Sequence, residues 1–228
     1  MIGIIGAMDV EVDFLKNNLK EYKRISIAGS LYYSGKIGEN NVVVTKCGVG
    51  KVNASIAATI LIMKFGCDKI INTGIAGGTA LTKPKDIVIP TKFAYSDVDV
   101  TCFGYEFGQI PGSPLFYTPD DNLLIEAKKA LQSLGLPYKC GTVLTADKFV
   151  SKKAEYEKMH IDDVMACEME GGAIAQTCMK LKTSFIAIRY ISDQIEEESQ
   201  IADYSAFETE MALMSAKICY QIVEKINY

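Results

Sequence analysis

Two carboxylates, Glu168 and Glu170, lie inside an apolar stretch, VMACEMEGGAIA, whose neighbouring residues are small or hydrophobic. Burying an uncompensated charge is costly, so paired acids in such surroundings usually have a chemical role. At a spacing of two, both side chains share a face only where the backbone is extended. We therefore expect a strand end or a strand-to-helix turn that directs both acids into one cleft. The alternative is that one or both are solvated loop residues.

Three other apolar runs also end in segments with unusual residues. GAMDVE places Asp9 and Glu11 where a helix begins, although acids there could simply favour the helix dipole. NTGIAGG is a β-branched run that ends in glycines. IRYISD carries Arg189 and Asp193 at the end of an apolar strand, where an Arg–Asp ion pair is the simpler interpretation. Together these segments supply several acids and one arginine.

The same segments lack the motifs of phosphate, metal and histidine chemistry. NTGIAGG is not followed by Lys-Ser or Lys-Thr, and the chain has no G-x-G-x-x-G pattern. His160 is the only histidine, and the seven cysteines form no C-x-x-C pair, so we expect no metal and no cofactor. Acids alone can cleave a glycosidic bond: one activates water, another protonates the leaving group, and others hold sugar hydroxyls.

Strands that alternate with helices must position these residues. This order predicts a single α/β domain over residues 1–228, with a mixed, mostly parallel central sheet flanked by helices. The chemistry should lie at the carboxyl ends of the strands. Asp120 or Asp121 offers an N-cap for one helix and Gly135 its C-cap. Strands are expected in 1–7, 30–48 (a hairpin), 68–78, 85–95, 139–147, 164–168 and 184–193, and helices in 9–19, 51–63, 118–135, 171–181 and 204–228.

Composition narrows the partners and the compartment. The net charge of −4 comes without a basic stripe, so nucleic acid is not expected as a partner. The longest apolar runs are shorter than a membrane span, and the first residues do not form a signal peptide, so no membrane association is expected. Seven scattered cysteines indicate free thiols in a reducing, cytoplasmic setting.

Six strings, in this order, resemble the 5′-methylthioadenosine/S-adenosylhomocysteine nucleosidases of the purine nucleoside phosphorylase superfamily: IGIIGAMDVEV, KCGVGKVNA, INTGIAGG, DVDVTCFGYEFGQIPG, CEMEGGAIA and IRYISD. The likeness covers nearly the whole chain. It implies a nucleoside phosphorylase-like fold, a homodimer and no cofactor. The implied reaction is hydrolysis of the N-glycosidic bond of methylthioadenosine and S-adenosylhomocysteine to adenine and the 5-substituted ribose, with 5′-deoxyadenosine as a further candidate substrate.

The resemblance also implies catalytic roles for residues of this chain. Glu11 matches the general base for the attacking water, and Arg189 matches a residue that helps to hold that water and the sugar site. Asp193 matches the general acid that protonates nitrogen 7 of adenine, with Ser192 beside it as support.

Other matches imply contacts with the bound nucleoside. Glu170 matches the carboxylate that binds the ribose hydroxyls, with Met169 packed under the sugar and Glu168 nearby. Phe149 matches the aromatic residue that stacks on the purine, and Val150 matches its neighbour that hydrogen-bonds through the backbone.

The remaining matches fall into three sets. The glycine segment of the substrate site comprises Ile75, Ala76 and Gly77. The walls of the pocket for the 5′ substituent are Met8, Val49 and Tyr204. The residues that the family lends to the neighbouring subunit's pocket are Val100, Phe103 and Pro111.

Two positions depart from the family pattern. Ile75 stands where the family commonly has serine, so a hydroxyl near the water and the ribose is missing, which puts water positioning and substrate range in doubt. Asp9 in place of the more usual glutamate is a milder change.

Two other functions remain as alternatives. A nucleoside phosphorylase would need cationic or neutral donors for phosphate, whereas GAMDVE is acidic and Ile75 lacks a hydroxyl. A non-catalytic nucleoside-binding protein could use the same scaffold, since fold does not fix function. The joint presence of Glu11, Glu170, Arg189 and Asp193 argues against it.

Overall fold

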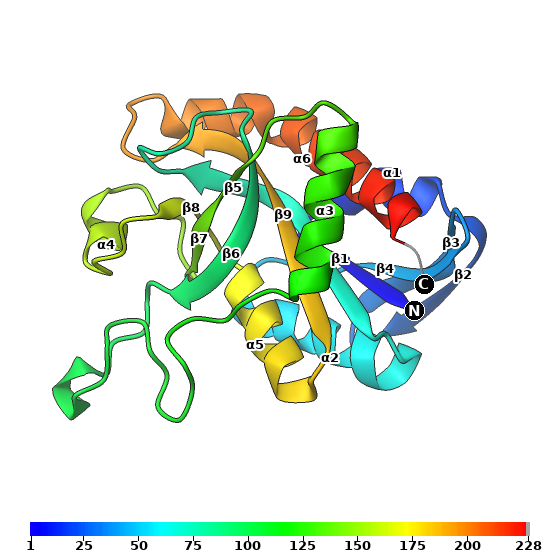
Figure 1. Ribbon diagram of the computed structural model, residues 1–228, viewed down its shortest axis with the longest axis horizontal. Helices are drawn as coiled ribbons and strands as arrows, with labels where there is room; N and C mark the ends of the chain where they lie inside the picture. Colours follow the sequence, from blue (N-terminus) through cyan, green and yellow to red (C-terminus); the bar gives the residue numbers. More distant parts are fainter. Residues whose placement is uncertain (227–228) are drawn as a thin grey trace.

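The computed structural model describes residues 1–226. Its strands form one nine-stranded sheet, which is flanked by helices (Figure 1). The strands are β1 (Ile2–Gly6), β2 (Lys20–Ile27), β3 (Ser30–Ile37), β4 (Asn40–Lys46), β5 (Lys69–Gly78), β6 (Ile87–Tyr95), β7 (Lys139–Thr145), β8 (Val164–Glu168) and β9 (Ser184–Gln194). The helices are α1 (Asp9–Asn17), α2 (Lys51–Phe65), the 3₁₀ turn η1 (Thr101–Phe103), α3 (Asp121–Ser133), α4 (Ala154–Glu157), α5 (Gly171–Leu181) and α6 (Gln200–Lys225).

The sheet is mixed, as the sequence predicts, and half of it closes on itself. The order runs β2-β3-β4-β1-β5-β8-β7-β6-β9, and β9 pairs again with β5. Parallel pairings join β1 to β4 and β5, β5 to β9, and β7 to β6 and β8. The closed half is therefore a small barrel of five strands, which the sequence did not predict.

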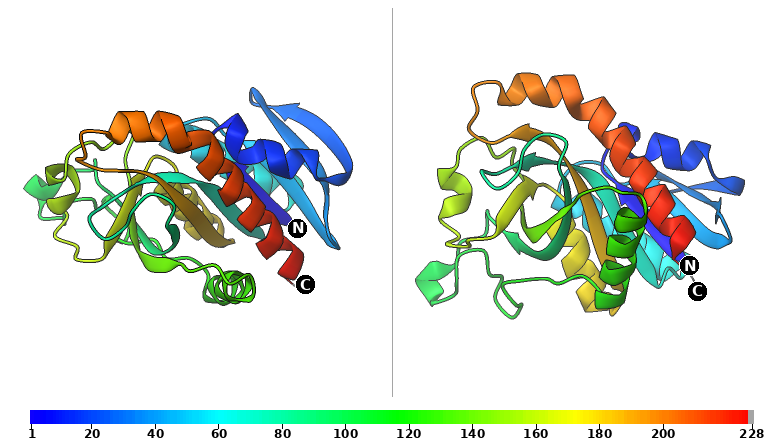
Figure 2. Two further views of the ribbon diagram at one scale, coloured as in Figure 1. Left: turned by 90° about the horizontal axis from the view of Figure 1, so that it is seen from above. Right: turned by 45° about the horizontal axis from the view of Figure 1, so that its top comes forward.

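Helices cover the sheet on both faces (Figure 2). Along β9, Ile186 and Ile188 pack in one apolar cluster with α1, α3 and α6, whereas Phe185 and Ala187 pack in a second cluster with α2 and α5. This alternation follows from the period of two in a strand. β9 is thus buried on both faces, which explains the unbroken apolar run from Phe185 to Ile188.

Most predicted elements lie within a few residues of the observed ones, and Asp120 is the N-cap of α3, with its side chain accepting from the Leu123 N–H at 3.0 Å. The C-cap of α3 is Leu134, and Gly135 follows it at a φ of +67°. β2 was not predicted from the sequence; it is an edge strand whose side chains are nearly all exposed. The last helix begins at Gln200 rather than Tyr204, and its predicted end, Tyr228, lies outside the described residues.

The glycines of the segment INTGIAGG lie inside a strand. The strand expected over 68–78 is confirmed as β5, and its glycines continue the strand to Gly78 rather than forming a loop. A Cβ at Gly74 would lie 2.6 Å from Glu11 Oε1, and one at Gly77 would lie 3.1 Å from Asp193 Oδ2. The glycines therefore let two acidic side chains approach the backbone of the strand.

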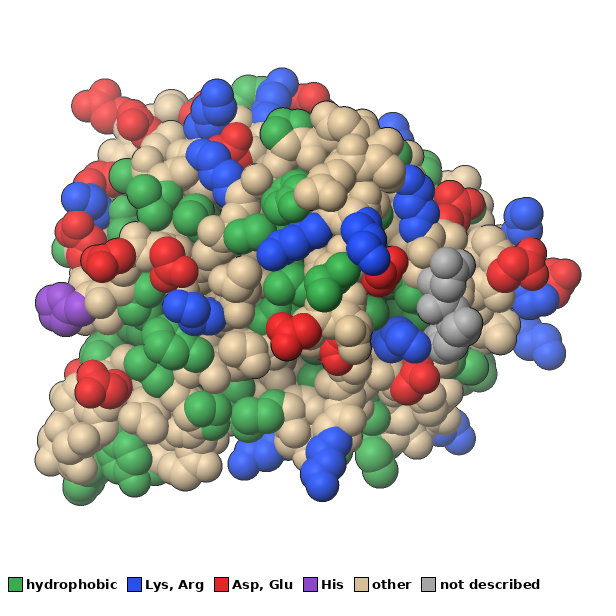
Figure 3. Space-filling view, viewed as in Figure 1, with side chains coloured by type: hydrophobic (Ala, Val, Ile, Leu, Met, Phe, Trp, Pro, Cys, Tyr) green, Lys and Arg blue, Asp and Glu red, His purple; other side chains and the backbone are tan. Residues whose placement is uncertain are grey.

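Charged side chains of both signs are interspersed over the face of the molecule seen in Figure 3. No helix among residues 1–226 is both long enough and apolar enough to cross a membrane. Within the same residues, no group of three or more His, Cys, Asp or Glu side chains is arranged to hold a metal ion.

Candidate active site

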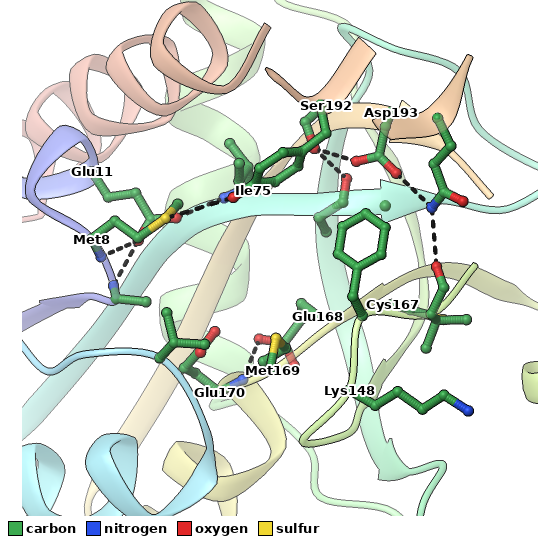
Figure 4. Close-up of a pocket in the computed structure, with 18 residues that line it drawn as sticks. Met8, Glu11, Ile75, Lys148, Cys167, Glu168, Met169, Glu170, Ser192 and Asp193 are labelled. Carbon is green, nitrogen blue, oxygen red and sulfur yellow. Dashed lines mark hydrogen bonds between the residues drawn. The ribbon is translucent and has the colours of Figure 1, made fainter. Parts of the chain in front are cut away.

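The carboxyl ends of β1, β5, β8 and β9 meet around a cavity of about 580 Å³, open mouth included (Figure 4). β1, β5 and β9 are parallel, so their carboxyl ends lie at one edge of the sheet, and β8, which is antiparallel to β5, brings Cys167 opposite Gly77. The predicted site residues that line it are Met8, Glu11, Val49, Ile75, Ala76, Gly77, Phe149, Val150, Glu168, Met169, Glu170, Ser192, Asp193 and Tyr204. Those that do not line it are Arg189, Val100, Phe103 and Pro111.

Glu11 lies at one end of the cavity beneath three backbone N–H groups. Its Oε2 accepts from Ala7 at 2.6 Å and from Met8 at 3.1 Å, and its Oε1 accepts from Ile75 at 3.1 Å. Burial raises the pKa of Glu11, while the charge of Arg189 and the three N–H donors oppose that rise. The donors fix the carboxylate in place and leave Oε1 with capacity for a further partner.

Glu168 and Arg189 form a buried ion pair below the cavity. Arg189 Nη2 lies 2.7 Å from Glu168 Oε2, and the guanidinium also donates to Asn72. The simpler interpretation of an Arg189–Asp193 pair is therefore wrong. Within the described residues, Arg189 Nε has no hydrogen-bond partner. The arginine supports the site from beneath, through Glu168.

Glu168 in turn fixes the start of α5. Its Oε2 accepts from the backbone N–H groups of Glu170 at 3.0 Å and Gly171 at 2.6 Å, and its Oε1 accepts from the Thr145 hydroxyl. Both Glu168 and Glu170 are buried, so the alternative that they are solvated loop residues is wrong. The expected strand-to-helix turn is present: Glu168 ends β8 and Glu170 is the N-cap of α5.

Glu170 projects into the cavity with one firm partner. Its Oε1 accepts from the Gly50 N–H at 2.7 Å. Burial, together with the nearby charge of Glu168, raises the pKa of Glu170 to about 8, although the Gly50 N–H and Arg189 act in the opposite direction. A carboxylate held this way is a strong acceptor for ligand hydroxyls, and its burial should cost the protein stability.

Glu170→Gln should therefore raise the melting temperature at about pH 8 by several degrees and have little effect near pH 4.5. The pKa of Glu170 is raised on folding, so its charge destabilises the fold progressively as pH rises from the ordinary value of 4.5 towards 8. Glutamine stays neutral and still accepts from Gly50. Differential scanning calorimetry at both pH values measures the difference.

Glu168→Gln is the matched control, because it leaves Arg189 buried without its charged partner and should lower the melting temperature. Equal melting temperatures of Glu170→Gln and wild type at about pH 8 would contradict the buried charge at position 170.

Asp193 occupies the other end of the cavity, where two side chains hold its carboxyl group. Its Oδ1 lies 2.6 Å from the Ser192 hydroxyl, and its Oδ2 accepts from Gln200 Nε2 at 2.9 Å. Burial raises the pKa of Asp193, and the hydrogen bonds from Ser192 and Gln200 partly offset it. A raised pKa suits a group that must deliver a proton near neutral pH.

Apolar side chains form the walls between the two acids. Phe149 stands edge-on to Tyr204, with ring centroids 5.6 Å apart, and the Tyr204 hydroxyl lies 3.8 Å from the Met8 sulfur. The Ile75 side chain lines the cavity where a serine hydroxyl would otherwise be. Its backbone N–H still binds Glu11, so the departure at Ile75 leaves the base in place.

Four residues that were not predicted from the sequence also line the cavity: Ala7, Lys148, Cys167 and Gln200. Ala7 and Cys167 adjoin predicted residues, so widening each motif by one position would have included them. Gln200 lies in the polar run QIEEESQ, which carries no signal of burial.

The chain is similar to known proteins over nearly its whole length. The family model described as the phosphorylase superfamily matches residues 1–224. A 5′-methylthioadenosine/S-adenosylhomocysteine nucleosidase of Halalkalibacterium halodurans is 42% identical, with 99% of each chain covered.

Two solved structures show the same fold. The nucleosidase of Neisseria meningitidis in complex with methylthio-immucillin-A has a TM-score of 0.94 at 36% identity, with 99% of both chains covered. The nucleosidase of Colwellia psychrerythraea in complex with adenine has a TM-score of 0.91 at 37% identity, covering 100% of this chain and 97% of that one. This chain belongs to the 5′-methylthioadenosine/S-adenosylhomocysteine nucleosidases, within the phosphorylase superfamily.

Proposed function

We propose that this protein hydrolyses the N-glycosidic bond of 5′-methylthioadenosine and S-adenosylhomocysteine, releasing adenine and the 5-substituted ribose. The observation that carries the proposal is the pair of buried acids at opposite ends of one cavity (Figure 4). Glu11 binds the backbone of β5 at Ile75 and Asp193 lies beside Gly77, so about 7 Å of strand separates their contacts.

The two acids divide the reaction between them. Glu11 takes a proton from a water molecule, whose oxygen attacks the anomeric carbon as the glycosidic bond breaks. Asp193 gives its proton to nitrogen 7 of the departing base, which receives the electron pair of the broken bond. Glu11 is fixed by three N–H donors and Asp193 by two side chains, so little reorganisation is needed during the step.

The remaining residues bind and orient the nucleoside. Glu170 accepts from the ribose hydroxyls, Met169 packs under the sugar, and Phe149 stacks on the purine beside the Val150 backbone. The 5′ substituent lies between Met8, Val49 and Tyr204. Arg189 does not line the cavity, so its role is to hold Glu168, and through it Glu170, in place.

Water is favoured over phosphate as the nucleophile by the charges around the cavity. Glu11, Glu168, Glu170 and Asp193 are acidic, and Lys148 is the cationic side chain among the lining residues. A phosphate dianion would have to approach Glu11 at its end of the cavity, where the Ile75 side chain offers no donor.

We also propose that the protein works as a homodimer. Phe103, on η1, is 77% exposed, and η1 projects from the body of the molecule (Figure 1). Val52 and Met63 on α2 are 69% and 70% exposed. Apolar side chains of this size are a liability in water unless a partner covers them. In such a dimer Val100, Phe103 and Pro111 would complete the partner's 5′ pocket.

Phe103→Asp should weaken the dimer and raise KM for methylthioadenosine together, because one loop would serve both purposes. Analytical ultracentrifugation and initial rates measure the two effects. Ile125→Asp, at an exposed position of α3, is the control and should change neither. A fully active Phe103→Asp monomer would refute this role of the loop.

The thiols bear on the cellular compartment of the protein, and the sheet bears on its domain organisation. All seven cysteines are free, which supports a reducing, cytoplasmic location. One sheet contains all the strands from Ile2 to Gln194, and we therefore propose that residues 1–228 form one nucleosidase domain.

Release of adenine in phosphate-free buffer tests the proposal. The purified protein should liberate adenine from methylthioadenosine and from S-adenosylhomocysteine, and added phosphate should not raise the rate. A phosphorylase would require phosphate, and a nucleoside-binding protein would release no adenine; either result would overturn the proposal.

A further inference from the structure

Gln200, the first residue of α6, links the two parts of the site that should meet the purine. Its Nε2 lies 2.9 Å from Asp193 Oδ2 and 3.0 Å from the Val150 carbonyl oxygen. Gln200 is only 4% exposed and lines the cavity, and its hydrogen bond to Asp193 places it at the end of the cavity where that acid lies. One amide nitrogen therefore joins the proposed acid to the segment 146–150, which carries Phe149 and is called the purine loop below.

The two partners of Asp193 differ in what they can do. The Gln200 amide nitrogen carries two hydrogens and can only donate. The Ser192 hydroxyl can donate or accept, and it also lies 3.3 Å from the Ala76 carbonyl oxygen, so it can adjust to either protonation state of Asp193. Gln200 is thus the partner that favours the ionised carboxylate throughout.

We propose that Gln200 is a positioning residue for Asp193, which holds the carboxyl group against the purine loop and stabilises the carboxylate that forms as the proton leaves. The inference rests on the proposed function. In the step, the O–H bond of Asp193 breaks, an N–H bond to the base forms, and the base takes the electron pair of the glycosidic bond. A donor to Asp193 gains strength as negative charge develops there, so it acts on kcat more than on KM.

The surroundings of Asp193 predict the effect on pH dependence. Burial raises the pKa of this carboxyl group, whereas Ser192 and Gln200 hold it down. The titratable groups that share this end of the site come from three elements: Asp203 and Tyr204 on α6, Cys167 on β8, and Lys148 in the purine loop. Loss of the Gln200 donor should raise the pKa of Asp193 further, so the basic limb of the kcat profile should move to higher pH.

Gln200→Met tests this prediction, since methionine has similar length but no donor. We expect kcat for methylthioadenosine to fall by about 10- to 100-fold, because a hydrogen bond to a charged group is lost, while KM stays within about threefold. Gln194→Met is the matched control: Gln194 is the neighbour of Asp193 in β9, but its Nε2 binds the Thr79 carbonyl at 3.3 Å, outside the cavity. It should behave as wild type.

Gln200→Glu adds a signature that a merely structural role would not give. Glutamic acid can donate only while protonated, so its kcat relative to wild type should be highest near pH 5 and lowest near pH 8. If Gln200→Met fails to fold, this pH signature decides the matter.

The inference is overturned if Gln200→Met keeps kcat within about twofold of wild type with an unmoved basic limb, or if only KM rises. It is also overturned if Gln200→Glu shows the same kcat ratio at both pH values. Failure of the proposed function is a separate result, because wild type itself would then release no adenine.

Discussion

Asp193→Asn should lower kcat for methylthioadenosine by about 10²- to 10⁴-fold, the usual contribution of general acid catalysis. Without a proton donor, the departing adenine must leave as an anion. Asparagine fits the site, because its oxygen can accept from Gln200 and its amide can donate to the Ser192 hydroxyl, which then turns to the Ala76 carbonyl. Single-turnover release of adenine measures the loss.

Asp203→Asn is the matched control for this variant. Asp203, on α6, lies near Asp193 and raises the pKa of Asp193. The side chain of Asp203 accepts from the Ser199 hydroxyl and does not line the cavity. The same loss of charge there should leave kcat within about threefold of wild type. An Asp193→Asn enzyme with nearly full activity would mean that the base leaves without help from this residue.

Glu11→Gln should cause a loss of similar size, about 10²- to 10⁴-fold in kcat, because an amide cannot accept the proton of the attacking water. One of the three backbone donors, at Ala7, Met8 or Ile75, would also meet the new NH₂ group and lose its acceptor. Binding of an iminoribitol transition-state mimic should persist, since Glu170 and Asp193 remain. Calorimetric titration of Glu11→Gln with this mimic measures the binding and so distinguishes a loss of catalysis from a loss of the fold.

Asp9→Asn serves as the control in the same helical turn. Asp9 faces solvent and pairs with Lys46 at 2.7 Å, so its charge should matter little for the rate. Normal hydrolysis by Glu11→Gln would place the base elsewhere, with Glu170 as the next candidate.

The acids of the site could be predicted from local sequence, because they follow buried strands, whereas most other lining residues were implied only by the resemblance to the nucleosidases. The apolar surroundings of Glu168 and Glu170 indicated burial, and β9 could be recognised from its apolar run, Phe185 to Ile188, before Arg189. The helix start at Asp9 and Glu11 could be expected because acidic residues favour the first turn of a helix. Such features depend on a few neighbouring residues.

The features that were missed depend on contacts between distant segments. The barrel closes because β9 pairs with β5 on one side and β6 on the other, which strand patterns alone do not specify. Arg189 pairs with Glu168, 21 residues away, rather than with Asp193 in its own strand. Gln200 is buried only because α6 returns to the purine loop.

The nucleophile is the central claim, and its most direct test is product analysis in ¹⁸O-labelled water with inorganic phosphate in excess. The protein should convert methylthioadenosine to adenine and a phosphorus-free 5-methylthioribose that carries ¹⁸O at carbon 1 when trapped early and examined by mass spectrometry. Formation of the sugar 1-phosphate, with no free labelled sugar, would show that phosphate and not a Glu11-activated water attacks the glycosidic carbon.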